Sequence, residues 1–320
     1  MDNSFKIISL NIGMSNLLSD VISFITSYDI DVIFLQEIRL TLEQLQVKFG
    51  NFGYLVDVNI DEEDFSKPGT AILWKSSVPI VDVSTLLQCR CQIAFLNQHI
   101  LINVYAHSGS SRNKERGNLF ADHIFQFMSL HPNSSIILGG DFNSLLSPKD
   151  VENGIGFSQK FCPQLSDLVK TRDLFDAFRY LNPSAEEYTF FRPSAAPSRL
   201  DRFYLSSTLL PRIHKVKHFS SLSDHCGVFL SLDIGGMKKN VFTPRNNSYW
   251  KLNNAILQEE EFLENFSDLW LHLTSFKSNY VDVITWWDYL VKPSVQEFCT
   301  LYSKARSKRK KIQLSFGSLF

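Results

Sequence analysis

The sequence has few cysteines and no long apolar run, and each shortage excludes a class of protein. Its five cysteines are scattered over 320 residues without a CxxC pair, which excludes a tetrahedral zinc site of the usual spacing. We interpret them as reduced, mostly buried thiols, with Cys89 and Cys91 on one face of a strand. No apolar run is long enough to cross a bilayer, and an N-terminus with acidic Asp2 is a poor signal peptide. We therefore expect a nuclear or cytoplasmic protein, neither secreted nor bound to a membrane.

The sequence also lacks an excess of positive charge. Its 32 lysines and arginines are balanced by 33 acidic residues, which gives a net charge of -1 and a pI near 6.7. The whole molecule therefore has no field that attracts nucleic acid, and any contact with phosphate must come from locally clustered cations. With 44% hydrophobic residues, the chain can bury a full core. Composition alone predicts no function.

What the sequence does contain is a series of short apolar runs. Several are apolar on successive residues, which is typical of strands in a sheet that is covered on both faces. The later runs follow one another closely, which favours antiparallel pairing. The predicted strands are Phe5–Ile12, Asp31–Glu37, Thr70–Lys75, His99–Ala106, Ser135–Asn143, Tyr188–Arg192, Leu200–Ser206, Lys215–Phe219 and Val228–Ile234.

Helical spacing of apolar residues occurs between these runs, from Leu17 to Tyr28 and from Leu119 to Leu130. Strands in both halves of the chain, with helices between them, favour a layered fold over a barrel. We predict an α/β protein: a four-layer α/β sandwich of two mixed sheets packed face to face and flanked by helices.

The pattern changes at Gly235-Gly236, where the strand-like runs stop. We place a domain boundary there, with residues 1–236 as the sandwich and residues 237–320 as a helical appendage. The basic run Lys304–Lys311 is most simply a solvated helix end, and a role in nuclear import or nucleic-acid binding is the second interpretation. The appendage contains four of the five tryptophans: Trp250, Trp270, Trp286 and Trp287.

Polar residues stand at the ends of the predicted strands. Asn11, Glu37 and Asp141 lie at the ends of their strands, whereas Asp201 begins one and Asp224-His225 precedes the last. If the last two strands run antiparallel to the earlier ones, all of these residues meet along one edge. Each alone has an ordinary explanation, as a solvated strand end, a turn residue or a core histidine.

Taken together, the same positions assemble carboxylates, amides, the imidazole of His225 and the phenol of Tyr105. Clustered carboxylates repel one another unless a divalent cation neutralises them. Ligand sets made of oxygen atoms are typical of Mg²⁺ or Mn²⁺ rather than of zinc or copper. The pattern therefore predicts a magnesium or manganese site of the kind used in phosphoryl transfer.

Five short motifs carry a resemblance to a known family. They appear in the order found in the endonuclease/exonuclease/phosphatase superfamily, and the match covers roughly residues 5 to 234. Within that superfamily, the chain most resembles the apurinic-type endonuclease domain of non-LTR (LINE-type) retrotransposons. The motifs are Leu35-Gln36-Glu37, Asn103-Val104-Tyr105, Gly140-Asp141-Phe142-Asn143, Arg199-Leu200-Asp201 and Ser223-Asp224-His225.

Three segments suggest the retrotransposon type: Gly140–Ser147, Ser198–Leu205 and Ser223–Phe229. The stretch Tyr249–Asn253, the pair Trp286-Trp287 and the basic run Lys304–Lys311 resemble the linker that leads to a reverse transcriptase in such polyproteins. We expect a fragment or a stand-alone derivative of such an element.

The resemblance implies a metal site. Glu37, helped by Asn11, would hold the Mg²⁺ or Mn²⁺, and Asp224 would lie near a second or alternative metal position. The expected product is a DNA nick with a 3′-hydroxyl and a 5′-phosphate.

The resemblance also implies roles in the reaction. Asp141 would activate and aim the attacking water, and Asn143 would orient it. His225, held by Asp201, would donate to a non-bridging phosphate oxygen as charge builds. Tyr105 would contact the phosphate or the leaving oxygen.

One departure from the family concerns the loop after Tyr105. Many relatives have a proline after the next residue, whereas this chain reads Ala106-His107-Ser108-Gly109, which leaves the placement of the loop unpredicted. Basic residues on this loop and near later motifs are candidates for contacts with DNA phosphates, or else are merely solvated. They are Arg112, Lys114, Arg116, Arg192, Arg199 and Arg202.

Two other functions fit the same motifs. The first is a phosphatase of the same fold that acts on a phosphorylated small molecule or lipid, such as an inositol phosphate, or a deadenylase. The second is a catalytically idle remnant that binds DNA or a partner. The basic loops and the polyprotein-like C-terminal segment favour DNA as the substrate. We expect a monomer, and the sequence identifies no protein partner.

Overall fold

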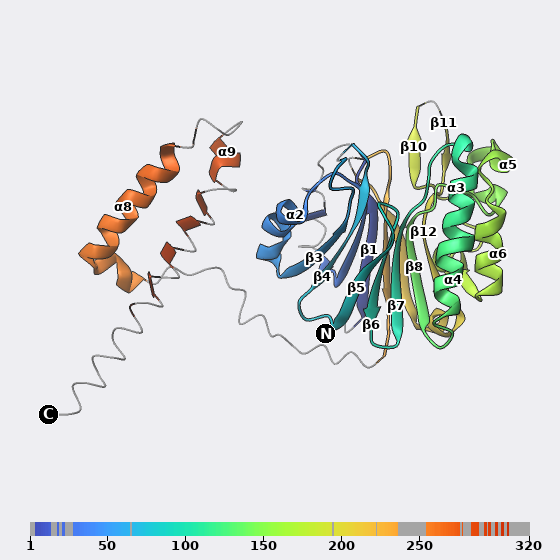
Figure 1. The fold of residues 1–320 in the computed structure, drawn as a ribbon, viewed down its shortest axis with the longest axis horizontal. Helices are drawn as coiled ribbons and strands as arrows, with labels where there is room; N and C mark the ends of the chain where they lie inside the picture. The colour runs from blue at the N-terminus through green and yellow to red at the C-terminus, as the bar shows by residue number, and fades with distance from the viewer. Residues whose placement is uncertain are drawn as a thin grey trace. The chain divides into compact units, whose positions relative to one another are not determined.

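The computed structural model divides into two compact units, residues 1–241 and 242–320 (Figure 1). In the first unit it describes residues 4–13, 18, 21–22, 28–64, 66–193, 195–221 and 223–235. In the second it describes residues 254–275 and, between 277 and 306, residues 277, 283–287, 291–292, 294–295, 298–299, 302–303 and 306. Each unit is described by itself below.

The first unit contains two six-stranded sheets (Figure 1). One has the order β13 (Ile213–Phe219), β14 (Gly227–Leu232), β1 (Phe5–Asn11), β2 (Val32–Ile38), β4 (Gly69–Lys75) and β3 (Tyr54–Asn59). The other has the order β5 (Ile80–Leu87), β6 (Cys91–Leu96), β7 (His99–Tyr105), β8 (Ser135–Asp141), β12 (Asp201–Ser206) and β9 (Leu174–Asp176). A short hairpin pairs β10 (Phe190–Arg192) with β11 (Ala195–Ser198).

Both sheets are mixed. The pairs β1–β2 and β7–β8 are parallel, and the other neighbours within the sheets are antiparallel. The two sheets pack face to face on a core that includes Ile7, Phe34, Leu101 and Phe203. Burying an aliphatic or aromatic side chain of this size stabilises the fold by about 1.5–3 kcal/mol.

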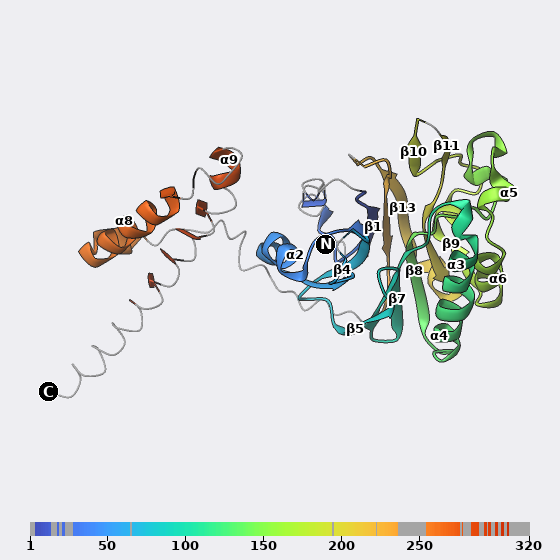
Figure 2. The same cartoon turned by 45° about the horizontal axis from the view of Figure 1, so that its top comes forward.

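Helices cover the outer faces of both sheets (Figure 2). On the first sheet, Leu45 and Phe49 of α2 (Leu42–Phe49) pack in the outer apolar cluster, and Thr41 caps the start of this helix. On the second, the helical segment α3 (Asn113–Asn118), η3 (Leu119–Ile124) and α4 (Phe125–Ser129) packs beside α6 (Pro163–Thr171). The predicted four-layer α/β sandwich is therefore confirmed.

Shorter helical pieces complete the first unit. They are η1 (Gly50–Phe52), η2 (Ser110–Arg112), η4 (Pro148–Asp150), η5 (Glu152–Gly154), α5 (Phe157–Lys160), α7 (Ala177–Leu181) and η6 (Ser207–Arg212). Of the helix predicted from Leu17 to Tyr28, only residues 18, 21, 22 and 28 are described, and these are helical. The helix predicted to start at Leu119 begins earlier, at Asn113.

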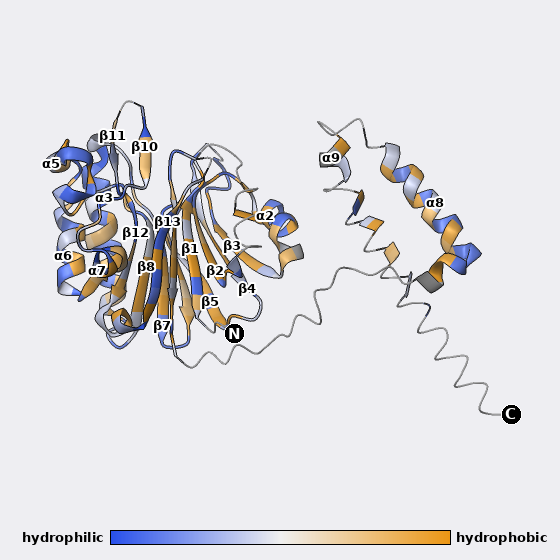
Figure 3. Cartoon of the chain, turned by 180° about the vertical axis from the view of Figure 1, so that it is seen from behind, coloured by the Kyte–Doolittle hydropathy of each residue, from blue (hydrophilic) through white to orange (hydrophobic). Residues whose placement is uncertain are grey.

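All nine predicted strands are present, with ends shifted by one to a few residues. β1 and β2 are buried on both faces, and apolar residues predominate in both strands (Figure 3). The strands β3, β5, β6, β9 and β11 had no predicted range. The expectation that Cys89 shares a strand face with Cys91 is wrong, because Cys89 lies in the turn before β6 and has a φ of 61°. The described structure contains no disulfide, and four of the five thiols are buried.

The described part of the second unit is helical. It contains η7 (Asn254–Gln258), α8 (Glu260–Ser275) and α9 (Val283–Trp286). Trp286 is buried, and its indole nitrogen donates to the Leu273 carbonyl at 3.0 Å. Trp250, the stretch Tyr249–Asn253 and all but one residue of the basic run Lys304–Lys311 lie outside the described residues. Within the described parts of both units, no helix is long and apolar enough to span a membrane.

Candidate active site

The strand order brings the predicted polar residues to one edge of the two sheets. Asp141 at the end of β8 lies directly opposite Asp201 at the start of β12, because these strands are antiparallel. Tyr105 at the end of β7 lies beside Asp141 in the parallel pair. Asn11 ends β1 in the other sheet, next to β2. The antiparallel return of β12 and β14, assumed from the sequence, is observed.

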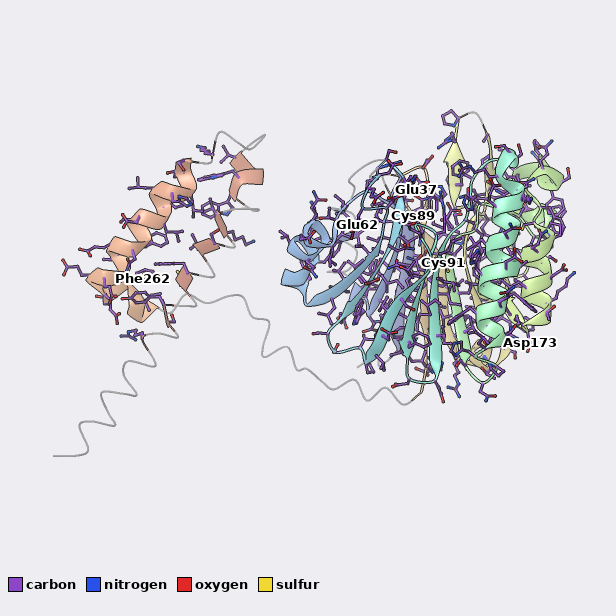
Figure 4. All side chains as sticks on the ribbon, in the orientation of Figure 1. Glu37, Glu62, Cys89, Cys91, Asp173 and Phe262 are labelled. Carbon is purple, nitrogen blue, oxygen red and sulfur yellow. The ribbon has the colours of Figure 1, made fainter. Side chains whose placement is uncertain are left out.

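Glu37 lies at this edge, in an unusual backbone conformation (Figure 4). The strand was predicted to end there, but β2 continues to Ile38 and the pairing register shifts at Glu37, which has a φ of 60°. Such a bulge redirects a side chain at a cost in backbone strain. Asn11 Nδ2 and Tyr105 Oη both donate to Glu37 Oε1 at 3.1 Å. Among the described residues, none hydrogen bonds to Oε2, so this oxygen is available to a ligand.

Asp141 is fully buried, and both of its oxygens accept hydrogen bonds. Asn143 donates from its backbone nitrogen to Oδ1 at 2.9 Å and from Nδ2 to Oδ2 at 2.9 Å, while Asn11 Nδ2 donates to Oδ2 at 3.0 Å. Burial and the charge of Asp201 raise the pKa of Asp141 to about 7, against the opposing effect of His225. Gly140 makes this placement feasible, because its φ is 136° and a Cβ there would lie 2.0 Å from the Val104 carbonyl oxygen.

His225 and Asp201 form a buried pair. Nδ1 of His225 lies 2.9 Å from Oδ2 of Asp201, which also accepts a 2.7 Å hydrogen bond from Thr189 Oγ1. Burial alone would lower the pKa of His225, but the carboxylates of Asp201 and Asp141 raise it to about 10. The imidazole is therefore protonated at neutral pH. Because Nδ1 is paired, Nε2 is the atom that can donate to a ligand.

The donor atoms at this edge fit a hard divalent cation. Ligand atoms of Asp141, Asp201 and His225 lie within 4.8 Å of one another. Asp201 Oδ1 is buried without a hydrogen-bond partner among the described residues, which leaves an uncompensated carboxylate oxygen in the cluster. A protonated His225 does not bind a metal, so the atoms left for a cation are the carboxylate oxygens of Asp141, Asp201 and Glu37 and the amide oxygen of Asn11, the ligand types that Mg²⁺ and Mn²⁺ prefer.

Asp224 is engaged differently from the other acidic residues. Its Oδ2 accepts a 2.8 Å hydrogen bond from Arg192 Nη2, in an ion pair that is partly exposed. It is not one of the three residues whose ligand atoms cluster around Asp141. The predicted role of Asp224 at a second metal position therefore stays a prediction.

Two of the predicted DNA contacts, Arg199 and Arg202, are corrected by the structure. Both side chains are at most 1% exposed. Arg199 donates to Asp150 at 2.7 Å and to Asp176 at 2.6 Å, and Arg202 lies 3.4 Å from Asp150. Their charges are neutralised by internal carboxylates, so they are not available to a phosphate. They anchor the segment that carries Asp201 instead.

Arg116 is also buried, and it fixes the loop that lacks the family's proline. Its Nη1 donates to the carbonyl of His107 at 2.6 Å and to that of Gly109 at 3.3 Å. It is therefore an internal structural residue and not an exposed phosphate contact. Arg112, Lys114 and Arg192 are exposed, as a contact with DNA requires.

Two residues at the site were missed by sequence reasoning. Arg90 places its guanidinium carbon 4.6 Å from the centroid of the Tyr105 ring, and thus brings a cation to the edge beside Glu37. Thr189 accepts hydrogen bonds from the backbone nitrogens of Leu200 and Asp201, both at 3.0 Å. Neither residue belongs to a motif, and only the fold brings them to the site.

Comparison with known proteins gives a relative in sequence and solved structures with a similar fold. The 149 kDa protein of transposon TX1 from Xenopus laevis is 27% identical over 220 residues, which are 67% of this chain and 16% of that protein. Two solved structures have a similar fold: the 3′ phosphatase NExo from Neisseria, bound to a product DNA hairpin, and the 3′-5′ exonuclease NExo from Neisseria meningitidis. Each is 19% identical with a TM-score of 0.59 and covers 72% of this chain, over 99% and 100% of the respective structures.

These likenesses agree with the motifs at the site. The transposon relative supports the resemblance to a retrotransposon endonuclease domain, although the chain spans only 16% of that protein. The solved structures support the fold. The sequence model of the Endonuclease/Exonuclease/phosphatase family matches residues 8–225, a range that includes every predicted catalytic and metal-binding residue from Asn11 to His225. The chain therefore belongs to the Endonuclease/Exonuclease/phosphatase family.

Proposed function

We propose that the protein is a Mg²⁺- or Mn²⁺-dependent phosphodiesterase that nicks DNA and leaves a 3′-hydroxyl and a 5′-phosphate. The observation that carries this proposal is the continuous hydrogen-bond network from Glu37 through Asn11 to Asp141 and Asn143. This network lies beside the paired His225 and Asp201. It provides carboxylates that can bind a cation, a carboxylate that can accept a proton from a water, and a protonated imidazole that can donate to a phosphate.

The reaction begins with a water hydrogen bonded to Asp141. This water attacks the phosphorus and passes a proton to the carboxylate, which a pKa of about 7 suits to act as a base near neutral pH. Asn143 and Asn11 hold the carboxylate in place. The new bond joins the water oxygen to phosphorus, and the bond from phosphorus to the 3′-oxygen breaks.

Charge that builds on the phosphate is stabilised from two sides. Nε2 of His225 donates to a non-bridging oxygen, and the pairing of Nδ1 with Asp201 fixes the ring for this role. Glu37 and Asn11 would hold the cation, which neutralises phosphate charge and polarises the phosphorus. Burial raises the pKa of Tyr105, so its phenol stays protonated and can donate to the phosphate or the leaving oxygen.

DNA is favoured as the substrate by two observations. The transposon relative is 27% identical to this chain, and one of the similar solved structures is described with a DNA hairpin. The exposed cations Arg112, Lys114 and Arg192 belong to the same unit as the catalytic edge. A phosphatase that acts on a small phosphorylated molecule or lipid, or an idle remnant, remains the competing proposal.

Incubation with supercoiled plasmid tests the proposal. We expect conversion to nicked circles with Mg²⁺, none in EDTA, and 3′ ends that a DNA polymerase extends without prior treatment. Parallel reactions contain an abasic oligonucleotide, an oligonucleotide with a 3′-phosphate and an inositol phosphate. Hydrolysis of the inositol phosphate with intact plasmid would replace this proposal by the phosphatase, and inactivity on every substrate would favour the remnant.

A further inference from the structure

A cleft opens beside the catalytic edge, with Asn143 on its border. Its volume is about 390 Å³. Three of the described residues that line it are basic, namely Arg116, Lys160 and Arg192, and no described lining residue is acidic. Hydroxyl and backbone groups of the loop at Gly109 complete one side. Although the whole chain has a net charge of -1, the basic residues that line this cleft make it suited to bind an anion.

The three cations differ in the groups that accept hydrogen bonds from them. Arg192 pairs with Asp224 at 2.8 Å, and Arg116 donates to loop carbonyls. Lys160, at the end of α5, donates from Nζ to Ser198 Oγ at 3.5 Å, which is the one hydrogen bond of this ammonium group among the described residues. Among the described residues, no carboxylate lies within ion-pair distance of it. Neither Lys160 nor Arg116 has a carboxylate partner among the described residues, but Arg116 is held by loop carbonyls, so Lys160 is the cation of the cleft with the weakest hydrogen bonding.

The surroundings of Lys160 destabilise the charged form of its ammonium group. Nζ lies 5.6 Å from the centroid of the Phe190 ring, and that ring also packs 4.9 Å from the ring of His225. Burial lowers the pKa of Lys160, with the charge of Asp141 opposing the shift. A half-buried ammonium group without an anion is unfavourable, and a bound anion would remove this penalty.

We propose that Lys160 binds a second phosphate of the DNA strand that is cut, next to the phosphate held at Asp141 and His225. This rests on the proposed function and names a specificity residue for it. Asn143 belongs to both the cleft and the catalytic network, so a phosphate in the cleft would be a neighbour of the reacting phosphate on the same DNA strand. Phe190 and Leu200 supply an apolar wall for the intervening sugar. Lys160 thus selects a polynucleotide over a substrate with one phosphate.

A methylphosphonate scan tests this inference. Oligonucleotides each carry one neutral methylphosphonate at a successive position along one strand, and binding to the full-length protein is measured by fluorescence anisotropy in EDTA. Neutralising one position should weaken wild-type binding about tenfold, as expected for a lost charge-assisted contact. Lys160→Gln should bind the unmodified DNA about tenfold more weakly and be insensitive to that one position, because both changes remove the same contact.

Two controls separate a direct contact from a general charge effect. Lys170→Gln removes the same charge from an exposed residue of α6 outside the cleft, and it should leave the full methylphosphonate response. Lys160→Arg keeps the charge and should retain most of the coupling. Thermal melts check that Lys160→Gln is folded.

The outcomes distinguish this inference from the proposed function. If no position couples to Lys160, or if Lys160→Gln and Lys170→Gln behave alike, the second phosphate site does not exist. If the coupling is present while plasmid is never nicked, the site stands and the nicking proposal fails. If the wild type binds no oligonucleotide, both fail.

Discussion

At the scale of single residues, two residues of the site have a backbone conformation that is unfavourable for residues other than glycine. Glu37 and Asn143 have φ values of 60° and 44°, and a residue other than glycine in this region costs about 1–3 kcal/mol. Asn143 lowers this cost with its own hydrogen bonds to Asp141. Glu37 receives hydrogen bonds from Asn11 and Tyr105. Seven described residues other than glycine have a positive φ, and these two belong to the hydrogen-bond network of the site.

The roles of Asp141 and His225 predict a non-additive pair of variants. Asp141→Asn and His225→Ala should each lower the nicking rate by on the order of 10²-fold or more, because one removes the base and the other the donor to the phosphate. DNA binding should persist in both. The double variant should lose less than the product of the two effects, since both groups serve one transition state. Near-normal turnover in either single variant would place the chemistry elsewhere.

Glu37 is expected to control the requirement for metal. Glu37→Gln keeps the shape of the side chain but removes its charge, so the reaction should need more Mg²⁺ and be slower at saturation. A Mg²⁺ titration of the nicking rate measures this. Glu62→Gln is the matched control, since Glu62 is an exposed carboxylate of the same unit (Figure 4). An unchanged Mg²⁺ dependence in Glu37→Gln would remove Glu37 from the metal site.

The exposed Arg112 of η2 and the buried Arg116 of α3 are expected to respond differently to salt. Arg112 is exposed, so Arg112→Ala should reduce the slope of log affinity against log salt by about one counterion. Arg116 is 2% exposed and holds the loop carbonyls, so Arg116→Ala should leave the slope unchanged and lower thermal stability. Binding isotherms at several salt concentrations test both. A reduced slope for Arg116→Ala would mean that its charge does reach DNA.

At the scale of elements, β12 depends on a buried cluster of ion pairs. Asp150, in η4, lies within hydrogen-bond distance of Arg199 and Arg179, and Arg199 also reaches Asp176. Removing one partner of a buried pair leaves an uncompensated charge and destabilises a protein by about 3–5 kcal/mol. The cluster therefore fixes the start of β12, and with it Asp201 and its partner His225.

This cluster predicts how stability responds to acid. Burial alone would raise the pKa of Asp150, but Arg202 and Arg199 hold it well below its usual range. A lowered folded-state pKa stabilises the protein above the unfolded value of about 3.9, and this contribution is lost as pH falls below it. Below about pH 4, the unfolding free energy should therefore fall with a steeper slope in the wild type than in Asp150→Asn. Urea titrations at stepped pH measure the slopes, and equal slopes would contradict the assignment.

Most interior strands of the two sheets could be predicted from the sequence, with β6 as the exception, whereas of the four edge strands only β13 was predicted and β3, β5 and β9 were not. β2 begins with the apolar run Val32–Leu35 and β8 contains the run Ile136–Leu138, and such runs identify these strands. β5 is an edge strand with exposed Val81 and Asp82, and none of its residues is fully buried. The bulge at Glu37 has no signature in the sequence either, because it follows from pairing with β4.

The convergence of the site residues was more predictable than the charge pairing. Asp141, Asn143 and His225 are in motifs, and their convergence follows from strand direction alone. Arg199 and Arg202 carry the same charge as a phosphate contact, but Asp150 lies 49 and 52 positions earlier in the chain. Only the fold shows that these charges are neutralised internally.

At the scale of the whole molecule, the first unit has its own core, and its two sheets contain no strand from the described residues of the second unit. β14 ends at Leu232, and Ile234 packs in the inner core while its carbonyl lies 2.6 Å from His99 Nε2. Every predicted catalytic and metal-binding residue lies at or before His225. The second unit buries separate apolar clusters around Phe262 and Trp286. The sandwich therefore needs the chain as far as Ile234, and nothing in its core comes from the described residues after it.

A truncated chain of residues 1–236 is thus expected to fold and to nick plasmid at a rate close to that of the full chain. Its DNA affinity should be weaker, because the truncation removes the six basic side chains between Lys304 and Lys311. Thermal melts and nicking rates of the two chains measure this. A melting temperature close to that of the full chain would support the division at Gly236. An insoluble or much less stable truncated chain would show that the helical segment stabilises the sandwich, and that the unit which folds independently is larger than its sheets.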